Sequence, residues 1–316
     1  MAIEIDPQLD LQSIRIVRAI ADTGTITGAA RMLGYSQPAV SQHLQRTEAR
    51  LSLPLVTRVG RSVRLTEAGQ VLARHALTIA SALDAASGDL ADLAGLRTGT
   101  VRLAAFPTAS STIVPRLLAA MVRKHPGIQV NYIEAQPPEA VAMLREGSID
   151  LAITFSYPGD RFDPHRDSAN GLGIETLFTE EMVVVLPADH PLANQTIIDV
   201  AALADERWIA GCPRCRGHLL AVCELAGFTP AIAFETDNAS AVLNMVASGL
   251  GVAMLPRLAL ATATLPAGAA IRPHTPPSIR SIHLLANDGA RRVPSLAATS
   301  SLLHKLKGGD WGLSAV

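Results

Sequence analysis

Cysteine is scarce in this chain, whose 316 residues contain only Cys212, Cys215 and Cys223. Three cysteines in one short segment cannot form the spread-out disulfide framework of a small secreted domain. The first ten residues carry three acidic side chains and lack the basic segment that begins a signal sequence. No apolar run approaches the ~18 residues of a membrane span. These absences predict a cytoplasmic protein in a reducing compartment, neither exported nor inserted into a membrane.

Catalytic signatures are also missing. The chain contains no G-x-x-x-x-G-K, H-E-x-x-H or G-x-S-x-G motif. Its histidines are scattered, and His125, His190 and His274 each lie next to a proline, where turns are expected. We therefore expect a protein that is not an enzyme and needs no cofactor.

Charge is distributed unevenly along the chain. Residues 11–66 contain eight arginines and only two acidic residues, Asp22 and Glu48, which gives this stretch a charge of +6. Because the net charge of the whole chain is −1, the rest of the chain carries −7. A small basic module joined to a larger acidic one is typical of a polyanion binder, although a charged run can also be a solvated surface. The length and the 48% hydrophobic content fit two or three globular domains.

The basic module has the pattern of helix, tight turn and helix. Apolar residues at helical spacing end at Gly24, a short helix over 25–34 ends at Gly34, and a third helix begins after Ser36, a good N-cap. On this third helix Val40, Leu44, Thr47 and Leu51 form the inward stripe. The opposite face carries Gln37, Ser41, Gln42 and Gln45. Amides and hydroxyls on an exposed helix suit base readout in the DNA major groove, but they also occur on ordinary polar helix faces.

Residues 56–66 then read as a wing, two short extended pieces around Gly60 with arginines that can meet phosphates. The run from 25 to 69, with its AA, SQPAVS and LTEAG segments, resembles the winged helix-turn-helix of LysR-type transcriptional regulators. The chain departs from that pattern at Thr47, where the family has leucine, and at Val56, where it has phenylalanine; each packing loss should cost about 1–3 kcal/mol. The resemblance implies binding to promoter DNA, with RNA polymerase as a possible further partner. The predicted DNA-contacting residues are Thr25, Thr27, Ser36, Gln37, Pro38, Ala39, Ser41, Gln42, Gln45, Arg46, Arg58, Arg61 and Arg64.

A long helix is expected from Thr66 to about Gly95, because no proline interrupts this stretch. Two interleaved apolar series with a seven-residue period form an a/d seam of about three heptads. We expect the helix to pair with a copy of itself, which would fix the spacing of two DNA-binding modules; packing on its own domain is the alternative. The family resemblance favours the dimer and makes a tetramer the expected assembly. The two series are Ala76, Leu83 and Leu90, and Leu72, Ile79, Ala86 and Leu93.

Beyond residue 98 the pattern changes to alternating strands and helices. Strands are predicted at 99–106, 128–135 and 149–155 with helices at 112–124 and 138–146, which argues for a parallel sheet covered on both faces. Within 180–193 a buried strand is expected that ends at Pro187 and His190-Pro191. Further strands are expected at 231–236, 251–256 and 279–288, and helices at 218–225, 238–248 and 295–306. The HPLA segment (190–193) and VASGLGVAMLP (246–256) resemble the two-lobed effector-binding domain of the same family, built like a periplasmic solute receptor.

The predicted fold is therefore mixed. An all-α winged helix-turn-helix domain (1–65) is followed by a linker helix (66–97) and a two-lobed α/β domain (98–316), with lobe 1 at about 98–178 and 270–316 and lobe 2 at about 179–269. In such a domain the cleft between the lobes holds a small-molecule effector, and hydroxyls, N–H groups and arginines near it favour an anion. The hydroxyls could equally be helix caps, and Phe155 could belong to the core. The predicted effector contacts are Pro107, Thr108, Ser110, Ser111, Phe155, Cys212, Arg214, Arg216 and Asp237.

The cysteine segment allows three interpretations. Cys212, Cys215, His218 and Cys223 have spacing that zinc could use, although the first three are crowded. A thiol at a helix N-terminus beside arginines would instead be redox-active. The third interpretation is that these residues only line a cleft or fill a core. The leading hypothesis remains a ligand-responsive LysR-type regulator; the alternatives are a small-molecule receptor without sequence-specific DNA binding, a cysteine-based sensor, and last an enzyme.

Overall fold

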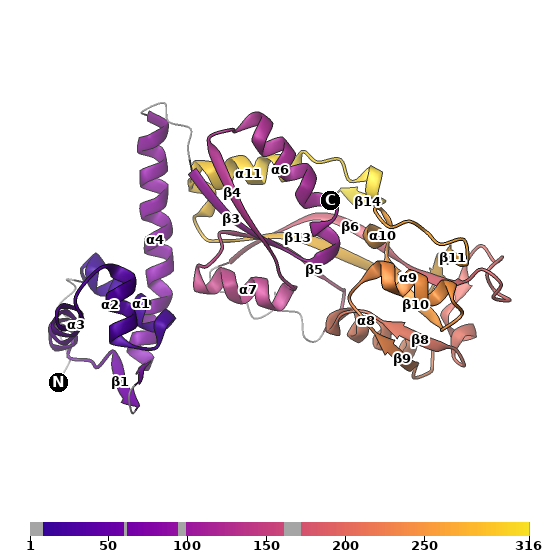
Figure 1. The fold of residues 1–316 in the computed structure, drawn as a ribbon, viewed down its shortest axis with the longest axis horizontal. Coiled ribbons are helices and arrows are strands. Elements are labelled where there is room, and N and C mark those ends of the chain that lie inside the picture. The colour runs from indigo at the N-terminus through magenta and orange to yellow at the C-terminus, as the bar shows by residue number, and fades with distance from the viewer. Residues whose placement is uncertain (1–8, 60–61, 94–98, 161–171, 316) are drawn as a thin grey trace. The chain divides into compact units, whose positions relative to one another are not determined.

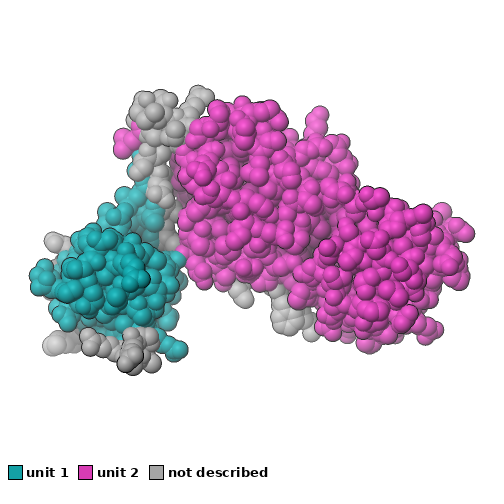
Figure 2. Space-filling view, in the orientation of Figure 1, with its two compact units in different colours: residues 1–87 teal, residues 88–316 magenta. Residues whose placement is uncertain are grey.

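The computed structural model describes residues 9–59, 62–93, 99–160 and 172–315. The chain divides into two compact units, residues 1–87 and 88–316 (Figure 2). Each unit has its own core. In the described ranges, no helix is both long enough and apolar enough to cross a membrane.

Unit 1 contains three short helices, a hairpin and the first part of a long helix. The helices begin at side-chain caps, since Asp10, Thr25 and Ser36 accept hydrogen bonds from N–H groups in the first turns of α1, α2 and α3. Gly24 and Gly34 end α1 and α2 in the left-handed conformation, as the sequence predicts. The elements are α1 (Leu11–Thr23), α2 (Ile26–Leu33), α3 (Gln37–Leu51), β1 (Val56–Val59), β2 (Ser62–Leu65) and α4 (Glu67–Leu93).

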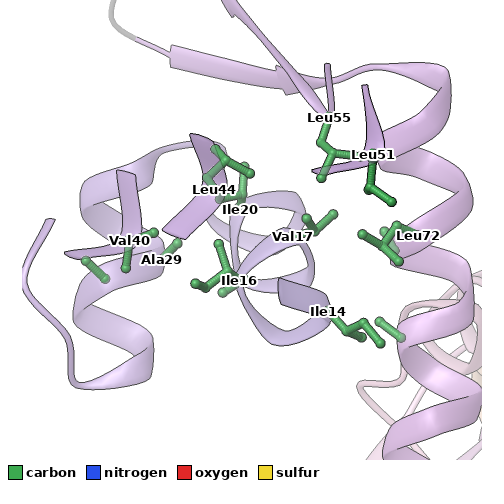
Figure 3. Close-up of a cluster of buried hydrophobic side chains, with 14 residues drawn as sticks. Ile14, Ile16, Val17, Ile20, Ala29, Val40, Leu44, Leu51, Leu55 and Leu72 are labelled. Atoms are coloured by element: carbon green, nitrogen blue, oxygen red, sulfur yellow. The ribbon is translucent and has the colours of Figure 1, made fainter. Parts of the chain in front are cut away.

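One apolar cluster holds unit 1 together. Ile16, Val17 and Ile20 of α1 are almost completely buried, and they meet side chains from α2, α3 and the residue before β1 (Figure 3). Leu72 on α4 belongs to the same cluster, as does Ala76 one turn further on. The first turns of α4 therefore pack on their own domain, which is the alternative that the a/d pattern left open for this part of the helix.

The LTEAG segment attaches α4 to the hairpin. The hydroxyl of Thr66 accepts a hydrogen bond from the N–H of Gly69 (3.1 Å) and donates one to the carbonyl of Pro54 (2.6 Å). Gly69 lies so close to the preceding loop that a Cβ atom there would be 2.1 Å from the carbonyl oxygen of Leu55. A residue without a side chain is therefore required at this contact.

Thr47, expected to be a packing defect, is a buried and satisfied polar residue. Its hydroxyl lies 2.7 Å from that of Ser13 on α1 and donates to the carbonyl of His43 (3.0 Å). The Ser13 hydroxyl also lies 3.0 Å from Nε2 of His43. A buried hydrogen-bonded pair thus stands where leucine was expected, and its cost in lost apolar burial is offset by interhelical hydrogen bonds. Val56 is partly buried against the apolar cluster.

Unit 2 is a two-lobed α/β structure. In the first lobe the strands run in the order β4-β3-β5-β13-β6, and β3 is parallel to both β4 and β5, as predicted. In the second lobe the order is β6-β10-β8-β9, with β8 parallel to β9 and β10. The strands are β3 (Gly99–Ala105), β4 (Ile128–Glu134), β5 (Leu151–Ser156), β6 (Leu172–Pro187), β7 (Ile198–Asp199), β8 (Arg207–Ala210), β9 (Ala231–Glu235), β10 (Val252–Pro256), β11 (Ala269–Arg272), β12 (His274–Thr275), β13 (Ile279–Asn287) and β14 (Leu313–Ala315).

Helices cover both faces of the sheet in the first lobe, α6 and α11 on one side and α7 on the other (Figure 1). In the second lobe Val242 and Val246 of α9 pack on Ile209 and Ala253 of the sheet. The helices of unit 2 are α5 (Pro107–Ser110), α6 (Ile113–Lys124), α7 (Pro137–Glu146), α8 (Pro213–Leu225), α9 (Ala239–Ala247), α10 (Arg257–Leu260) and α11 (Pro294–His304), with single 3-10 turns at Val200–Leu203, Ala290–Arg292 and Gly309–Trp311.

Strand β6 belongs to both lobes. Its first part pairs with β13, ending at the Ile279–Glu181 pair, and its last part pairs with β10 from Met182 onward. The strand predicted from residue 180 and ended by Pro187 does end at Pro187, but its predicted start was wrong, because the strand begins at Leu172. The stretch before Glu180 contains charged and polar residues because part of it is solvent-exposed, which hides it from a search for apolar runs.

Candidate functional sites

Helix α3 and the turn before it are exposed on the surface of unit 1. Ala29 and Ala30 of α2 are buried, and their small size allows the neighbouring helices to approach closely. Gly34, with φ of 71°, reverses the chain after α2, and the N–H of Tyr35 donates to the carbonyl of Ala30 (2.9 Å). The turn therefore presents the first turn of α3 to solvent.

The outward face of α3 is polar, as predicted. Gln37 donates from Nε2 to the hydroxyl of Ser41 (2.9 Å), which orients the amide along the helix surface. Ser41 is half-buried, whereas Thr25 and Ser36 serve as helix caps. The other predicted DNA-contacting residues with described side chains are exposed: Thr27, Gln37, Pro38, Ala39, Gln42, Gln45, Arg46 and Arg64. The Arg58 side chain and the whole of Arg61 lie outside the described residues.

Two of the arginines in unit 1 are held by carboxylates. Arg18 pairs with Asp22 on the same helix (3.0 Å), and Arg50 pairs with Asp10 (2.7 Å). Burial acts to raise the pKa of Asp10, but hydrogen bonds from Arg50 and from the N–H of Ser13 hold that pKa well below its usual range. The Arg50–Asp10 pair connects the end of α3 to the start of α1.

A pocket lies between the two lobes of unit 2. Residues of the first lobe, around α5 and the ends of β3 and β5, face residues at the starts of α8 and α9 and on β10. The empty space, including its open mouth, measures about 490 Å³. At the mouth, Nε2 of Gln136 donates to the carboxylate of Asp237 (3.2 Å) and connects the lobes. The lining residues are Phe106, Pro107, Thr108, Gln136, Phe155, Gly211, Cys212, Cys215, Thr236, Asp237, Ala239, Val242, Met254, Leu255, Pro256, Ala259 and Arg280.

A buried ion pair forms part of the pocket wall through Arg280. The Arg280 guanidinium donates to Oε1 of Glu180 from both Nε (2.8 Å) and Nη2 (2.6 Å), and the two side chains are 2% and 0% exposed. The other carboxylate oxygen of Glu180 accepts from the N–H of Leu258 (2.7 Å). The guanidinium carbon also lies 5.0 and 4.6 Å from the ring centres of Phe106 and Phe155. This arrangement compensates both charges inside a largely apolar wall.

The structure separates the predicted effector contacts into two groups. Pro107, Thr108, Phe155, Cys212 and Asp237 line the pocket. The remaining four, Ser110, Ser111, Arg214 and Arg216, are absent from its lining, and their side chains are engaged elsewhere. The structure therefore does not bring these four into this lining, although Ser111 lines a neighbouring hollow together with Thr108 and Asp237.

The hydroxyls of Ser110 and Ser111 donate hydrogen bonds to backbone carbonyls. Ser110 donates to the carbonyl of Phe106 (3.0 Å) and accepts a hydrogen bond from the hydroxyl of Tyr132, while Ser111 donates to the carbonyl of Thr108 (3.1 Å). Neither hydroxyl caps a helix, since α5 and α6 have no side-chain cap hydrogen bond; short polar side chains bond readily to carbonyls of their own turn.

The arginines are paired with acids. Arg214 binds Asp160 (2.9 Å) and stacks on Phe155, with 5.5 Å from its guanidinium carbon to the ring centre, and Arg216 binds Glu235 (3.0 Å). Sequence could not show these acids as partners, because they lie 54 and 19 residues away along the chain.

Cys212 and Cys215 form a disulfide in the pocket wall. Cys212 also caps α8, since its sulfur accepts from the N–H of Cys215 (3.2 Å). Cys223 is buried, which raises the pKa of its thiol to about 12. His218 stacks on Tyr157 with ring centres 4.0 Å apart, and burial lowers its pKa to about 4. Within the described residues no three metal-ligating side chains come together, so the zinc interpretation has no site there.

Several pocket residues escaped the sequence prediction. Arg280 lies on β13 among apolar residues. A charged residue within an apolar strand is unusual, and this is the sequence feature that could have identified it. Gln136, Thr236 and Met254 carry no comparable signal, because only the fold brings them to the pocket.

An exposed polar recognition helix on a helix-turn-helix, together with a pocket between two α/β lobes, defines a DNA-binding regulator with a ligand-binding domain. Residues 11–70 match the family described as "Bacterial regulatory helix-turn-helix protein, lysR family". Residues 94–306 match the family described as "LysR substrate binding domain". The chain belongs to the LysR family of transcriptional regulators. Such regulators bind promoter DNA, respond to small-molecule effectors and form oligomers; the chain is therefore a regulator and not an enzyme.

Individual relatives agree with this assignment. The chain is 31% identical over 256 residues to a probable hydrogen peroxide-inducible genes activator of Mycobacterium avium, covering 80% of this chain and 79% of the relative. It is 30% identical to the transcriptional regulator TtuA of Agrobacterium vitis, over 79% of this chain and 81% of the relative. Among solved structures, a full-length OxyR variant from Pseudomonas aeruginosa superposes with a TM-score of 0.72 at 23% identity, over 97% and 98% of the two chains.

Proposed function

We propose that this regulator senses its effector in the pocket between the lobes and transmits binding as a change in lobe arrangement. The observation that carries this proposal is the composition of the pocket wall, with Thr108 and Gln136 from one lobe and Asp237 and Met254 from the other. A ligand that touches both lobes has an affinity that depends on how they are arranged, and it therefore shifts the balance between arrangements.

In the same proposal α3 reads DNA bases and the arginines hold the backbone. Gln37, Gln42 and Gln45 are exposed amides that can pair with adenine edges, while Arg46 and Arg64 are exposed cations suited to phosphates. The parts that this mechanism requires are a DNA-binding domain at 1–65, a linker helix at 66–97 and an effector-binding domain at 98–316. A regulator placed at a promoter in this way can contact RNA polymerase, which we include as a proposed partner.

Fluorescence anisotropy with a duplex from upstream of the regulator's own coding region tests the DNA-binding part. Six to ten phosphate contacts would weaken binding about 10³- to 10⁵-fold between 50 and 200 mM salt. Gln37→Ala should lose preference for this duplex over a scrambled one while retaining most non-specific binding. Gln12→Ala, which removes an exposed amide from α1, is the matched control. Salt-insensitive binding, or equal effects of both variants, would contradict the proposal and favour a receptor that does not read DNA.

The second half of α4 is the proposed dimer contact. Leu83 and Leu90, on one predicted heptad series, are 39% and 67% exposed. Exposed leucines repeated at seven residues on a helix form the seam of a coiled coil when a second helix covers them. A dimer joined here is the proposed basic assembly, and a tetramer made of two such dimers is the proposed higher one.

Native mass spectrometry of the full chain tests the dimer. Leu83→Asp with Leu90→Asp should yield monomer, because carboxylates in the seam would be desolvated without partners. Thr78→Asp adds an exposed charge on the same helix away from the seam and should leave the oligomer intact. A double variant with the mass of the unmodified assembly would rule out this contact.

One observation favours a second candidate function, redox sensing. The Cys212–Cys215 disulfide lies in the pocket wall and at the start of α8, the helix that also carries Arg214 and His218. Those two side chains contact Asp160 and Tyr157. Oxidation of the dithiol forms the S–S bond and releases two protons and two electrons, which reduce one hydrogen peroxide molecule to two water molecules. Cleavage of this bond would free the first turn of α8, and with it the side chains that hold it to the segment after β5.

Redox titration separates the two functions. The protein is equilibrated with reduced and oxidised dithiothreitol, free thiols are counted by mass after maleimide labelling, and DNA affinity is measured in each state. A redox sensor should change its affinity with the thiol count, and Cys212→Ala with Cys215→Ala should abolish that change while Cys223→Ala retains it. If DNA affinity is the same in both redox states, the disulfide is structural and the small-molecule function remains alone.

A further inference from the structure

The charges around the interlobe pocket show what kind of molecule it can hold. This inference rests on the proposed function, since it concerns the effector of the same pocket. The only cationic side chain in the described lining is Arg280, and its charge is already matched by Glu180. Asp237 adds a negative charge at the mouth. An entering anion would thus be desolvated without gaining an uncompensated positive partner.

The remaining lining is predominantly apolar. Two phenylalanines, Phe106 and Phe155, meet edge to face with ring centres 4.9 Å apart, and Val242, Met254 and Leu255 form the opposite wall. Ligand pockets of this kind bind mainly through apolar surface, and a few polar groups fix the orientation of the ligand. The planar rings and the flexible methionine side chain favour a flat or compact hydrocarbon body.

Thr108 supplies one directional polar group. Its hydroxyl oxygen accepts a hydrogen bond from Nη2 of Arg280 (3.1 Å), so the hydroxyl itself has a proton to donate. Because the guanidinium polarises the hydroxyl, the O–H is a stronger donor than an isolated threonine. The fitting ligand group is an uncharged acceptor such as a carbonyl or ether oxygen.

We infer that the effector is a small, uncharged and largely apolar molecule bearing a hydrogen-bond acceptor that Thr108 engages. This differs from the sequence-based expectation of an anion, which relied on hydroxyls and N–H groups after residue 106 and on the added charge of Arg214 and Arg216. Both arginines are paired with acids, Asp160 and Glu235, and neither lines the pocket.

Isothermal titration calorimetry of the full-length protein with four probes of similar size tests the inference. Acetophenone is uncharged with an acceptor, ethylbenzene is uncharged without one, benzoate is an anion and benzylamine is a cation. Acetophenone should bind best, with benzoate and benzylamine at least about tenfold weaker, because each would bring an uncompensated charge into an apolar wall. The inference is overturned if either charged probe binds as tightly as acetophenone, or if none of the four binds at millimolar concentration.

Two variants locate the interaction. Thr108→Val should weaken acetophenone by about three- to tenfold and leave ethylbenzene unchanged, as expected for one lost hydrogen bond. Glu180→Gln removes the charge that balances Arg280 and should strengthen benzoate by about tenfold or more. Thr108 is only half-buried and its valine replacement keeps the same shape, so this variant tests the inference even if Glu180→Gln does not fold. Equal losses of acetophenone and ethylbenzene in Thr108→Val would contradict the assigned contact.

These measurements do not depend on DNA. If the chain fails to bind DNA but acetophenone binds in a Thr108-dependent way, the proposed regulatory mechanism is wrong and the inference about the pocket stands. If DNA binding behaves as proposed and benzoate is the preferred probe, the inference about the pocket is wrong and the proposed DNA-binding function stands.

Discussion

The Arg280–Glu180 pair should be one of the largest single contributors to the stability of unit 2. In Arg280→Met, Oε1 of Glu180 loses both of its hydrogen bonds, at 2.8 and 2.6 Å, while the carboxylate stays completely buried. Removing one partner of a buried pair typically costs about 3–5 kcal/mol, because the other charge remains desolvated and unpaired. For a unit of this size that corresponds to a fall in melting temperature of about 6–20 °C.

A second substitution should recover most of this loss. Glu180→Gln combined with Arg280→Met leaves no charge in the site, and the amide oxygen can still accept from the N–H of Leu258. The double variant should therefore lie within about 1–2 kcal/mol of the unmodified protein, which implies a coupling energy of at least about 2 kcal/mol.

The assay is urea unfolding followed by tryptophan fluorescence, since both tryptophans, Trp208 and Trp311, lie in unit 2. A neighbouring exposed pair, Arg257 with Glu181 at 3.0 Å, provides the control, and Arg257→Met should cost less than about 1 kcal/mol. If Arg257→Met and Arg280→Met cost the same, or if the double variant is no better than the single one, the reasoning from burial is refuted.

Three further predictions concern other parts of the chain. Gly69→Ala should destabilise unit 1 by about 2–3 kcal/mol in thermal unfolding by circular dichroism, because its Cβ would overlap the carbonyl of Leu55; an unchanged melting curve would show that the loop can move aside. Since burial lowers the pKa of His218 from 6.5 to about 4, its contribution to stability should be complete above pH 6.5 and fall by up to about 3 kcal/mol toward pH 4. Denaturant unfolding at pH 7.5 and 4.5 should show a smaller difference for His218→Phe, which keeps the stack on Tyr157, than for the unmodified chain; an equal difference would assign the pH dependence to other groups. Arg64→Ala should weaken binding to all duplexes alike and reduce the salt slope by about one per protomer, and a selective loss on one duplex would assign Arg64 to base readout.

The elements that the sequence predicted best are those whose signals are local. Ser36 caps its helix, and Gly24 and Gly34 end theirs, all within a few residues of the apolar pattern that they delimit. The alternation of strands and helices after residue 98 was similarly local, which is why the fold class could be predicted.

The sequence could not show which charged residues form ion pairs when the two partners are far apart along the chain. Arg214 and Arg216 read as free positive charges until the fold placed Asp160 and Glu235 beside them. Glu180 and Arg280, 100 residues apart, lie on adjacent strands that a single sequence cannot pair. The sequence therefore did not show that Arg214 and Arg216 are paired with acids and lie outside the pocket lining.

Thr47 illustrates the same limit within the core. As a polar residue in an apolar stripe it indicated a defect, because its partner Ser13 lies 34 residues away on another helix. A buried hydroxyl is harmful or harmless according to whether a second one faces it, and periodicity alone does not show that.

Strand β6 gives the effector-binding unit a mechanical character. One continuous strand from Leu172 to Pro187 is hydrogen-bonded to strands of both lobes, so the lobes share this strand. Hydrogen bonds on β6 resist bending of the strand within the plane of the sheet. Its twist can change more easily, because the twist between neighbouring strands varies widely in natural sheets. A few degrees of added twist near Glu181 and Met182, where β6 passes from one lobe to the other, would therefore change the relative orientation of the two lobes.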